Sequence, residues 1–118
     1  MAAILSELMA REARKKRCPA PLRALIQTWL DEDRRFNLWF LEVVKARYDE
    51  EPFVTMEDES YKAYTVLRES VLRYRSHPNR TNQALLIAAI QESTRIHRLY
   101  AGDWTPKKKK GRGALGPG

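Results

Sequence analysis

The feature that most constrains the fold of this chain is the scarcity of helix-breaking residues. Five glycines and six prolines occur among 118 residues, and they cluster, for example at Pro19 with Pro21 and from Gly111 to the end. Between the clusters, apolar residues recur at spacings of three and four, which is the period of an amphipathic α-helix. An all-β fold needs turn residues far more often. The sequence therefore predicts an all-α protein.

The first predicted element is a short basic helix over residues 2–17. Its apolar stripe is narrow, and the remaining residues are mostly Ala, Glu, Arg and Lys, which favour helices. Pro19 and Pro21 follow, and the residue before a proline avoids helical angles. We therefore expect residues 1–17 to form an N-terminal helical arm that projects from the rest of the protein. The stripe consists of Ile4, Leu5, Leu8 and Met9.

Residues 20–102 are expected to form an antiparallel bundle of three or four helices, because short connections make neighbouring helices antiparallel. Acidic residues at 31–33 interrupt the first apolar stripe, which leaves two possibilities. Residues 21–49 form one helix, or they form two helices with Asp31 or Asp33 capping the second. The residues expected on the buried faces are Leu22, Leu25, Ile26, Trp29, Leu30, Phe36, Phe40, Leu41, Val44, Tyr48, Tyr61, Tyr64, Leu67, Val71, Leu72, Tyr74, Leu85, Leu86, Ala89, Ile90, Ile96 and Tyr100.

Capping signals mark the ends of the later helices. Thr55 with a carboxylate at Asp58 resembles a capping box and predicts a helix that begins there. Asn79 or Thr81 is suited to cap the last helix, and Gly102 is suited to end it. Residues 103–118 are predicted to form a flexible basic tail, since a charged run with a Gly/Pro end does not pack into a core.

The net charge of +7 lies entirely in the two ends. Residues 1–17 carry +3 and residues 103–118 carry +4. The neutral middle is itself divided into an acidic segment, 18–59 with net −5, and a basic segment, 60–102 with net +5. These two segments either pair internally between packed helices or form complementary surfaces on neighbouring copies of the chain.

Basic runs at both ends favour contact with a polyanion. An anionic membrane surface and a nuclear address are alternatives to nucleic acid. Because no sequence-reading motif is present, we expect contact with the phosphate backbone and no base recognition, with DNA favoured over RNA. The expected nucleic-acid-binding residues are Arg11, Arg14, Lys15, Lys16, Arg17, Arg73, Arg75, Lys107, Lys108, Lys109, Lys110 and Arg112.

Residues that would support catalysis are few. Cys18 is the only cysteine, and His77 and His97 do not have metal-ligand spacing. No Gly-rich phosphate loop or nucleophile–base pair is recognisable. We therefore expect a non-enzymatic protein with no catalytic residues, metal or cofactor. The absence of a signal-peptide pattern and of a membrane span predicts an intracellular, non-secreted protein, or a virion location if the chain is a coat protein.

Four aromatic residues have two possible roles each. Phe36, Trp39 and Phe40 are able to stack on bases, but their helical spacing favours packing in the core. Trp104 lies beyond the predicted helices and either docks back on the bundle or meets a partner.

The arrangement of Arg11–Arg17 on an arm, a break at Pro19 and Pro21, and then a helical bundle resembles the major coat proteins of filamentous archaeal viruses. In that family an N-terminal helical arm wraps double-stranded DNA and four-helix bundles form the outer wall. The resemblance covers the layout of residues 1–102 and implies a self-assembling structural protein that binds DNA and further copies of itself or of a close paralogue. Two alternatives are an accessory protein of a ribosome or other ribonucleoprotein, and a phage-type adaptor or inhibitor that binds a protein.

Overall fold

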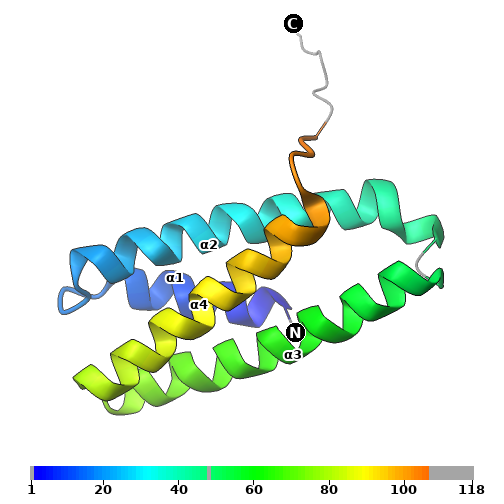
Figure 1. Ribbon diagram of the computed structural model, residues 1–118. Coiled ribbons are helices and arrows are strands. Elements are labelled where there is room, and N and C mark those ends of the chain that lie inside the picture. Colours follow the sequence, from blue (N-terminus) through cyan, green and yellow to red (C-terminus); the bar gives the residue numbers. More distant parts are fainter. Residues whose placement is uncertain (1, 48, 107–118) are drawn as a thin grey trace, which may run out of the picture.

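The computed structural model describes residues 2–47 and 49–106, and confirms the predicted all-α class with four helices packed against one another. Successive helices run antiparallel because the segments that join them are short (Figure 1). The four α-helices are α1 (Ala2–Arg14), α2 (Ala20–Trp39), α3 (Glu51–Ser76) and α4 (Arg80–Ala101).

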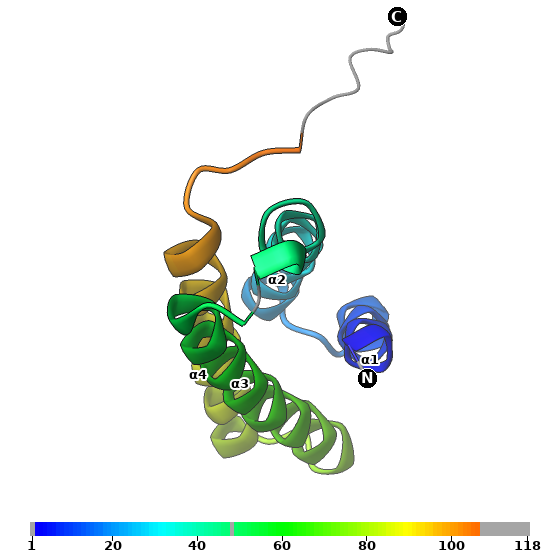
Figure 2. The ribbon, with the colours of Figure 1, turned by 90° about the vertical axis from the view of Figure 1, so that its right-hand side faces the viewer.

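The helices do not all contact one another equally. α4 packs along the later turns of α3, whose first turns extend beyond the end of α4, and α2 packs on α4 (Figure 1). α1 packs against α2 and α3 on the side of the bundle away from α4 (Figure 2). With 13 residues α1 is half the length of the 26-residue α3, so it covers only the half of the bundle near the α1–α2 connection.

Residues 20–47 form one continuous helical rod, which decides between the two possibilities left open for this region. The backbone stays helical after Trp39, first as a π-helical segment, Phe40–Val44, and then as a 3₁₀ turn, Lys45–Arg47. Asp33 does not cap a second helix, because it lies in the middle of α2 and is buried. The acidic residues at 31–33 therefore interrupt the apolar pattern without ending the helix.

α3 begins earlier than the capping-box pattern predicted. Glu50 is its N-cap residue and Pro52 lies in its first turn. A proline is tolerated there because the first amides of a helix have no intrahelical acceptor. Thr55 is inside the helix, where its hydroxyl donates to the Glu51 carboxylate at 3.1 Å. The prediction that a capping box at Thr55–Asp58 begins this helix is therefore wrong.

Both predicted ends of α4 are confirmed. The Asn79 side chain accepts a hydrogen bond from the Asn82 amide at 2.8 Å, so Asn79 is the N-cap. At the other end Gly102 adopts φ +55°, a left-handed conformation that side chains rarely adopt. Its amide still donates to the Arg98 carbonyl at 2.9 Å, and its positive φ then turns the chain out of the helix.

The first helix belongs to the main hydrophobic core. Leu5, Met9 and Ala13 are buried, with Met9 0% exposed, and they follow the i, i+4, i+8 spacing of one helix face. The prediction that residues 1–17 project from the bundle is therefore wrong. Other members of this core are Cys18, Leu22, Ile26, Trp29, Leu67, Val71, Tyr74, Leu86, Ala89 and Ile90.

A guanidinium explains why the two prolines do not uncouple α1 from the body. Arg23, in the first turns of α2, donates from Nε to the Ala13 carbonyl at 2.7 Å. Its Nη2 donates to the carbonyls of Lys15 at 3.2 Å and Cys18 at 3.1 Å. These carbonyls lie at and just beyond the end of α1, where acceptors lack intrahelical partners and a positive charge is favourable. Arg23 therefore holds the end of α1 against α2.

A second hydrophobic cluster lies between the later turns of the 20–47 rod and the first turns of α3. Its buried residues include Phe36 and Trp39, which confirms that these aromatic rings pack in the core, while Phe40 is half-buried against them. Trp104 also packs on this cluster, and its carbonyl accepts a hydrogen bond from Arg35 at 2.6 Å. Trp104 therefore docks back on the bundle. The other buried members are Val44, Met56 and Ala101.

Four residues predicted for buried faces are exposed instead. Tyr61 is 71% exposed and Leu41 is 58% exposed, and Leu72 and Leu85 are also exposed. At 100° per residue, Tyr61 and Leu72 lie about 120° and about 140° around α3 from the buried Leu67. The apolar pattern of α3 is therefore wider than the face that the bundle covers. The π-helical segment changes the register at Leu41.

Because Met9 fills the core between α1 and its neighbours, Met9→Ala is expected to lower the free energy of unfolding by about 2–5 kcal/mol. Urea denaturation followed by circular dichroism measures this change. Glu7→Ala, at an exposed position of the same helix, is the control and should change stability little. Equal stability of Met9→Ala and the wild type would show that α1 does not contribute to the core.

Candidate functional site

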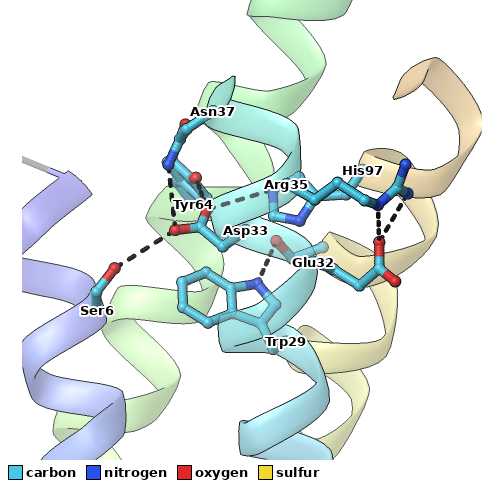
Figure 3. A network of polar contacts seen from close by, with 9 residues as sticks. Ser6, Trp29, Glu32, Asp33, Arg35, Asn37, Tyr64 and His97 are labelled. Carbon is cyan, nitrogen blue, oxygen red and sulfur yellow. Dashed lines mark hydrogen bonds and ion pairs between the residues drawn. The ribbon is translucent and has the colours of Figure 1, made fainter. Parts of the chain in front are cut away.

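A buried carboxylate joins three helices near the middle of the bundle (Figure 3). Asp33 of α2 is 4% exposed. The Tyr64 hydroxyl of α3 donates to Asp33 Oδ1, and Oδ2 accepts from the Ser6 hydroxyl of α1 and the Asn37 amide of α2, each at 3.4 Å. A buried charge is tolerated only where such donors surround it, so this carboxylate links α1, α2 and α3.

The fourth helix contributes His97, which is 1% exposed. Its Nε2 lies 3.5 Å from Asp33 Oδ1, but neither ring nitrogen has a hydrogen-bond partner among the described residues. The ring stacks on Phe36 with centroids 4.5 Å apart. One turn earlier on α4, the Ser93 hydroxyl accepts from Trp29 Nε1 at 2.8 Å. Polar groups from all four helices therefore meet here.

Burial controls the ionisation of this buried polar network. It lowers the pKa of His97 from 6.5 to about 4. The negative charge of Glu32 has a smaller effect that raises this pKa, and the positive charge of Arg35 has a smaller effect that lowers it further. Burial raises the pKa of Asp33, although the hydrogen bonds from Tyr64, Ser6 and Asn37 act in the other direction. Burial, with the Asp33 charge beside it, also raises the pKa of Tyr64 and keeps this hydroxyl a donor. His97 is consequently neutral near pH 7.

The network has the residue types of an acid–base site but not the access. His97 and Asp33 are almost completely covered by protein, so a dissolved substrate does not reach them in this structure. Among residues 2–47 and 49–106, no group of three or more His, Cys, Asp or Glu side chains is placed to hold a metal ion. The arrangement joins helices and defines how they pack.

A second feature, at one end of the bundle, gathers positive charge. The α1–α2 connection and the α3–α4 turn lie at the same end, at the left of Figure 1. The Arg17 guanidinium lies 5.9 Å from the centroid of the Tyr74 ring in the last turns of α3. Two basic segments that are far apart in the sequence therefore meet. We call this surface the basic end, and it consists of Arg11, Arg14, Lys15, Lys16, Arg17, Arg23, Arg73, Arg75 and Arg80.

Some of these side chains also have structural partners. Lys15 Nζ lies 2.5 Å from Glu12 Oε2 and Arg17 Nη2 lies 3.4 Å from Glu12 Oε1, and this carboxylate is buried. Together with Arg23, these residues hold the α1–α2 connection. Arg23 is also exposed, but its guanidinium donates to backbone carbonyls. The exposed residues of the basic end that form neither an ion pair nor a side-chain hydrogen bond with another described residue are Arg11, Arg14, Lys16, Arg73, Arg75 and Arg80.

The structure thus brings together seven of the residues predicted to bind nucleic acid: Arg11, Arg14, Lys15, Lys16, Arg17, Arg73 and Arg75. It adds Arg23 and Arg80 at the same end. The predicted residues Lys107, Lys108, Lys109, Lys110 and Arg112 lie outside the described residues, as does Tyr48.

The acidic and basic segments of the sequence pair with each other at few places. Among the described residues, Arg98 Nε lies 3.5 Å from Glu32 Oε2 across the α2–α4 interface, and Lys62 Nζ lies 3.2 Å from Asp58 Oδ2 within α3. Other ion pairs join near neighbours, as in Arg95 with Glu92. Internal pairing therefore accounts for a small part of the charge division.

Sequence reasoning missed the buried network, although a signal for it was present. Asp33 follows Ile26 and Trp29 at spacings of seven and four, which places it on the buried face of α2. His97 follows Ile90 and Ser93 in the same way on α4. The identity of the partners, in contrast, depends on helix pairing that spacing along one helix does not reveal.

Comparison with protein-family models, with curated proteins and with solved structures finds no match for this chain. Within residues 2–47 and 49–106, none of the helices has both the length and the apolar character that crossing a bilayer requires.

The low pKa of His97 predicts acid destabilisation. As the pH falls from 6.5 to about 4, the unfolded chain binds a proton at this histidine before the folded chain does. This difference lowers the free energy of unfolding by up to about 3 kcal/mol. Asp33 acts in the opposite sense, because its raised pKa favours proton uptake by the folded state.

Urea denaturation at pH 7 and at pH 4 isolates the contribution of His97 when the wild type is compared with His97→Gln. Asp33 is present in both proteins, so the variant should lose less stability on acidification than the wild type. His77→Gln, at an exposed position, is the control and should behave like the wild type. If His97→Gln and the wild type lose the same stability, His97 is not held neutral by burial.

Proposed function

We propose that the chain binds nucleic acid through its phosphate backbone and uses the basic end of the bundle to do so. The observation that carries this proposal is the meeting of two separate basic segments at one surface, shown by the contact of Arg17 with Tyr74. Basic residues that served only to keep the protein in solution would not need to be brought together from separate segments. Nine Arg or Lys residues from α1, α2, α3, α4 and the α1–α2 connection converge there.

The chemistry of the surface fits phosphate better than bases. Its exposed side chains are guanidinium and ammonium groups, which form charge-assisted hydrogen bonds with phosphate oxygens. Phe36 and Trp39, two of the aromatic residues considered for stacking on bases, are in the core. We therefore expect affinity that depends steeply on salt and little on sequence.

The position of α1 bears on the resemblance to filamentous coat proteins. That resemblance relied on an arm free to wrap DNA, whereas here Leu5 and Met9 bury α1 against α2 and α3. Binding at the end of a compact bundle does not require a free arm. The proposal is therefore a non-enzymatic nucleic-acid-binding protein, with duplex DNA as the first ligand to test.

The salt dependence of binding to a short labelled DNA duplex tests this function. Fluorescence anisotropy should give a slope of log affinity against log salt of roughly −4, if about half of the nine side chains of the basic end contact phosphate. Arg73→Ala with Arg75→Ala should make the slope shallower by about 2, because each lost phosphate contact removes about 0.9. A second duplex of the same length and a different sequence should bind with the same affinity.

A matched control removes the same charge elsewhere. Arg34→Ala with Arg95→Ala changes two exposed residues in the middle of α2 and α4 and should leave the slope unchanged. RNA of the same length and vesicles of anionic phospholipid are the alternative ligands. Binding to the vesicles without measurable binding to DNA or RNA at low salt would contradict the proposal.

A further inference from the structure

The end of the bundle opposite the basic end is acidic. It is formed by the last turns of the 20–47 rod and the first turns of α3, at the right of Figure 1. Two positive side chains, Lys45 and Arg47, occur in the same region, and Arg47 pairs locally with Glu50 at 3.4 Å. We call this surface the acidic end, and its exposed carboxylates are Glu42, Asp49, Glu50, Glu51, Glu57 and Asp58.

The two charged ends are too far apart to neutralise each other within one molecule. α3 runs from one to the other, and its 26 residues span about 39 Å at the helical rise. Charges in physiological salt are screened over about 8 Å. The attraction between the ends is therefore available only to another molecule.

Apolar side chains are also exposed near both ends. Leu41 and Val54 lie in the turns that form the acidic end, and Leu72 lies one turn before the end of α3 at the basic end. Apolar surface beside complementary charge is the composition of a protein interface, where burial adds to electrostatic attraction. The two ends therefore carry opposite charges, and both expose apolar side chains.

We propose that the acidic end of one molecule binds the basic end of a second copy, head to tail. The contact joins two different surfaces, so each added copy leaves one end of each kind free and the assembly extends. The contact does not depend on nucleic-acid binding, but both use the basic end. Nucleic acid and the acidic end of a neighbour therefore compete for Arg73 and Arg75.

Sedimentation velocity on the full chain, freed of nucleic acid, tests the contact. At low salt the average mass should rise with concentration above the monomer mass of 13.8 kDa, and high salt should return it towards that value. Glu42→Lys with Glu57→Lys should weaken association about tenfold or more, and so should Arg73→Glu with Arg75→Glu. All four positions are exposed, and circular dichroism verifies that each variant is folded.

The decisive measurement is an equimolar mixture of the two variants. The first keeps an intact basic end and the second keeps an intact acidic end, so a head-to-tail contact predicts that the mixture associates although neither variant does alone. Arg34→Glu, in the middle of α2, is the control and should associate like the wild type. A wild type that stays monomeric at low salt, or a mixture that fails to associate, would overturn the proposal.

The same variants separate this contact from the proposed function. Glu42→Lys with Glu57→Lys should lose self-association and still bind duplex DNA, because the basic end is intact. Arg73→Glu with Arg75→Glu should lose both. Duplex DNA added to the wild type should lower its degree of association. Self-association without DNA binding would contradict the proposed function alone, and DNA binding without self-association would contradict the contact alone.

Discussion

The packing of this bundle depends on the hydrogen bonds that the buried Asp33 carboxylate accepts. A charge at 4% exposure is unfavourable unless donors surround it, and here they come from Ser6 of α1, Asn37 of α2 and Tyr64 of α3. Because the donors are on different helices, they are satisfied together only when these helices meet in one arrangement. His97 of α4, stacked on Phe36, lies beside the same carboxylate. The polar network thus specifies helix packing that apolar contacts alone define less strictly.

The basic end combines structural and surface roles in the same short segment. Arg23 donates to carbonyls at the end of α1, and Lys15 and Arg17 surround the buried Glu12. These contacts hold the α1–α2 connection against α3, where Arg17 meets Tyr74. The neighbouring Arg14 and Lys16 are exposed as a consequence. A surface on a rigid helix end presents its charges in a defined arrangement, whereas a free arm would have to lose conformational entropy on binding.

Much of the fold could be predicted from the sequence because helical signals are local. The all-α class, the cap at Asn79, the stop at Gly102 and the burial of Phe36 and Trp39 follow from residues within a few positions of one another. The prediction for α1 was wrong because spacing along one helix does not show how many neighbouring helices it packs against. Its stripe looked too narrow for a core helix, but a contact of α1 with two neighbours at once needs only Leu5, Met9 and Ala13.

The sequence by itself determined where helices form and that the chain carries opposite charges in different segments, because backbone hydrogen bonding and charge depend on residues close together in the chain. Only the tertiary structure decided that the segments around Arg17 and Arg73 share one end and that the carboxylates around Glu57 form the other. It also decided that Asp33 faces donors from three helices instead of capping one. Spacing along a helix defines which face a residue occupies, but the neighbour of that face depends on how whole helices pack, and many distant side chains determine that packing together.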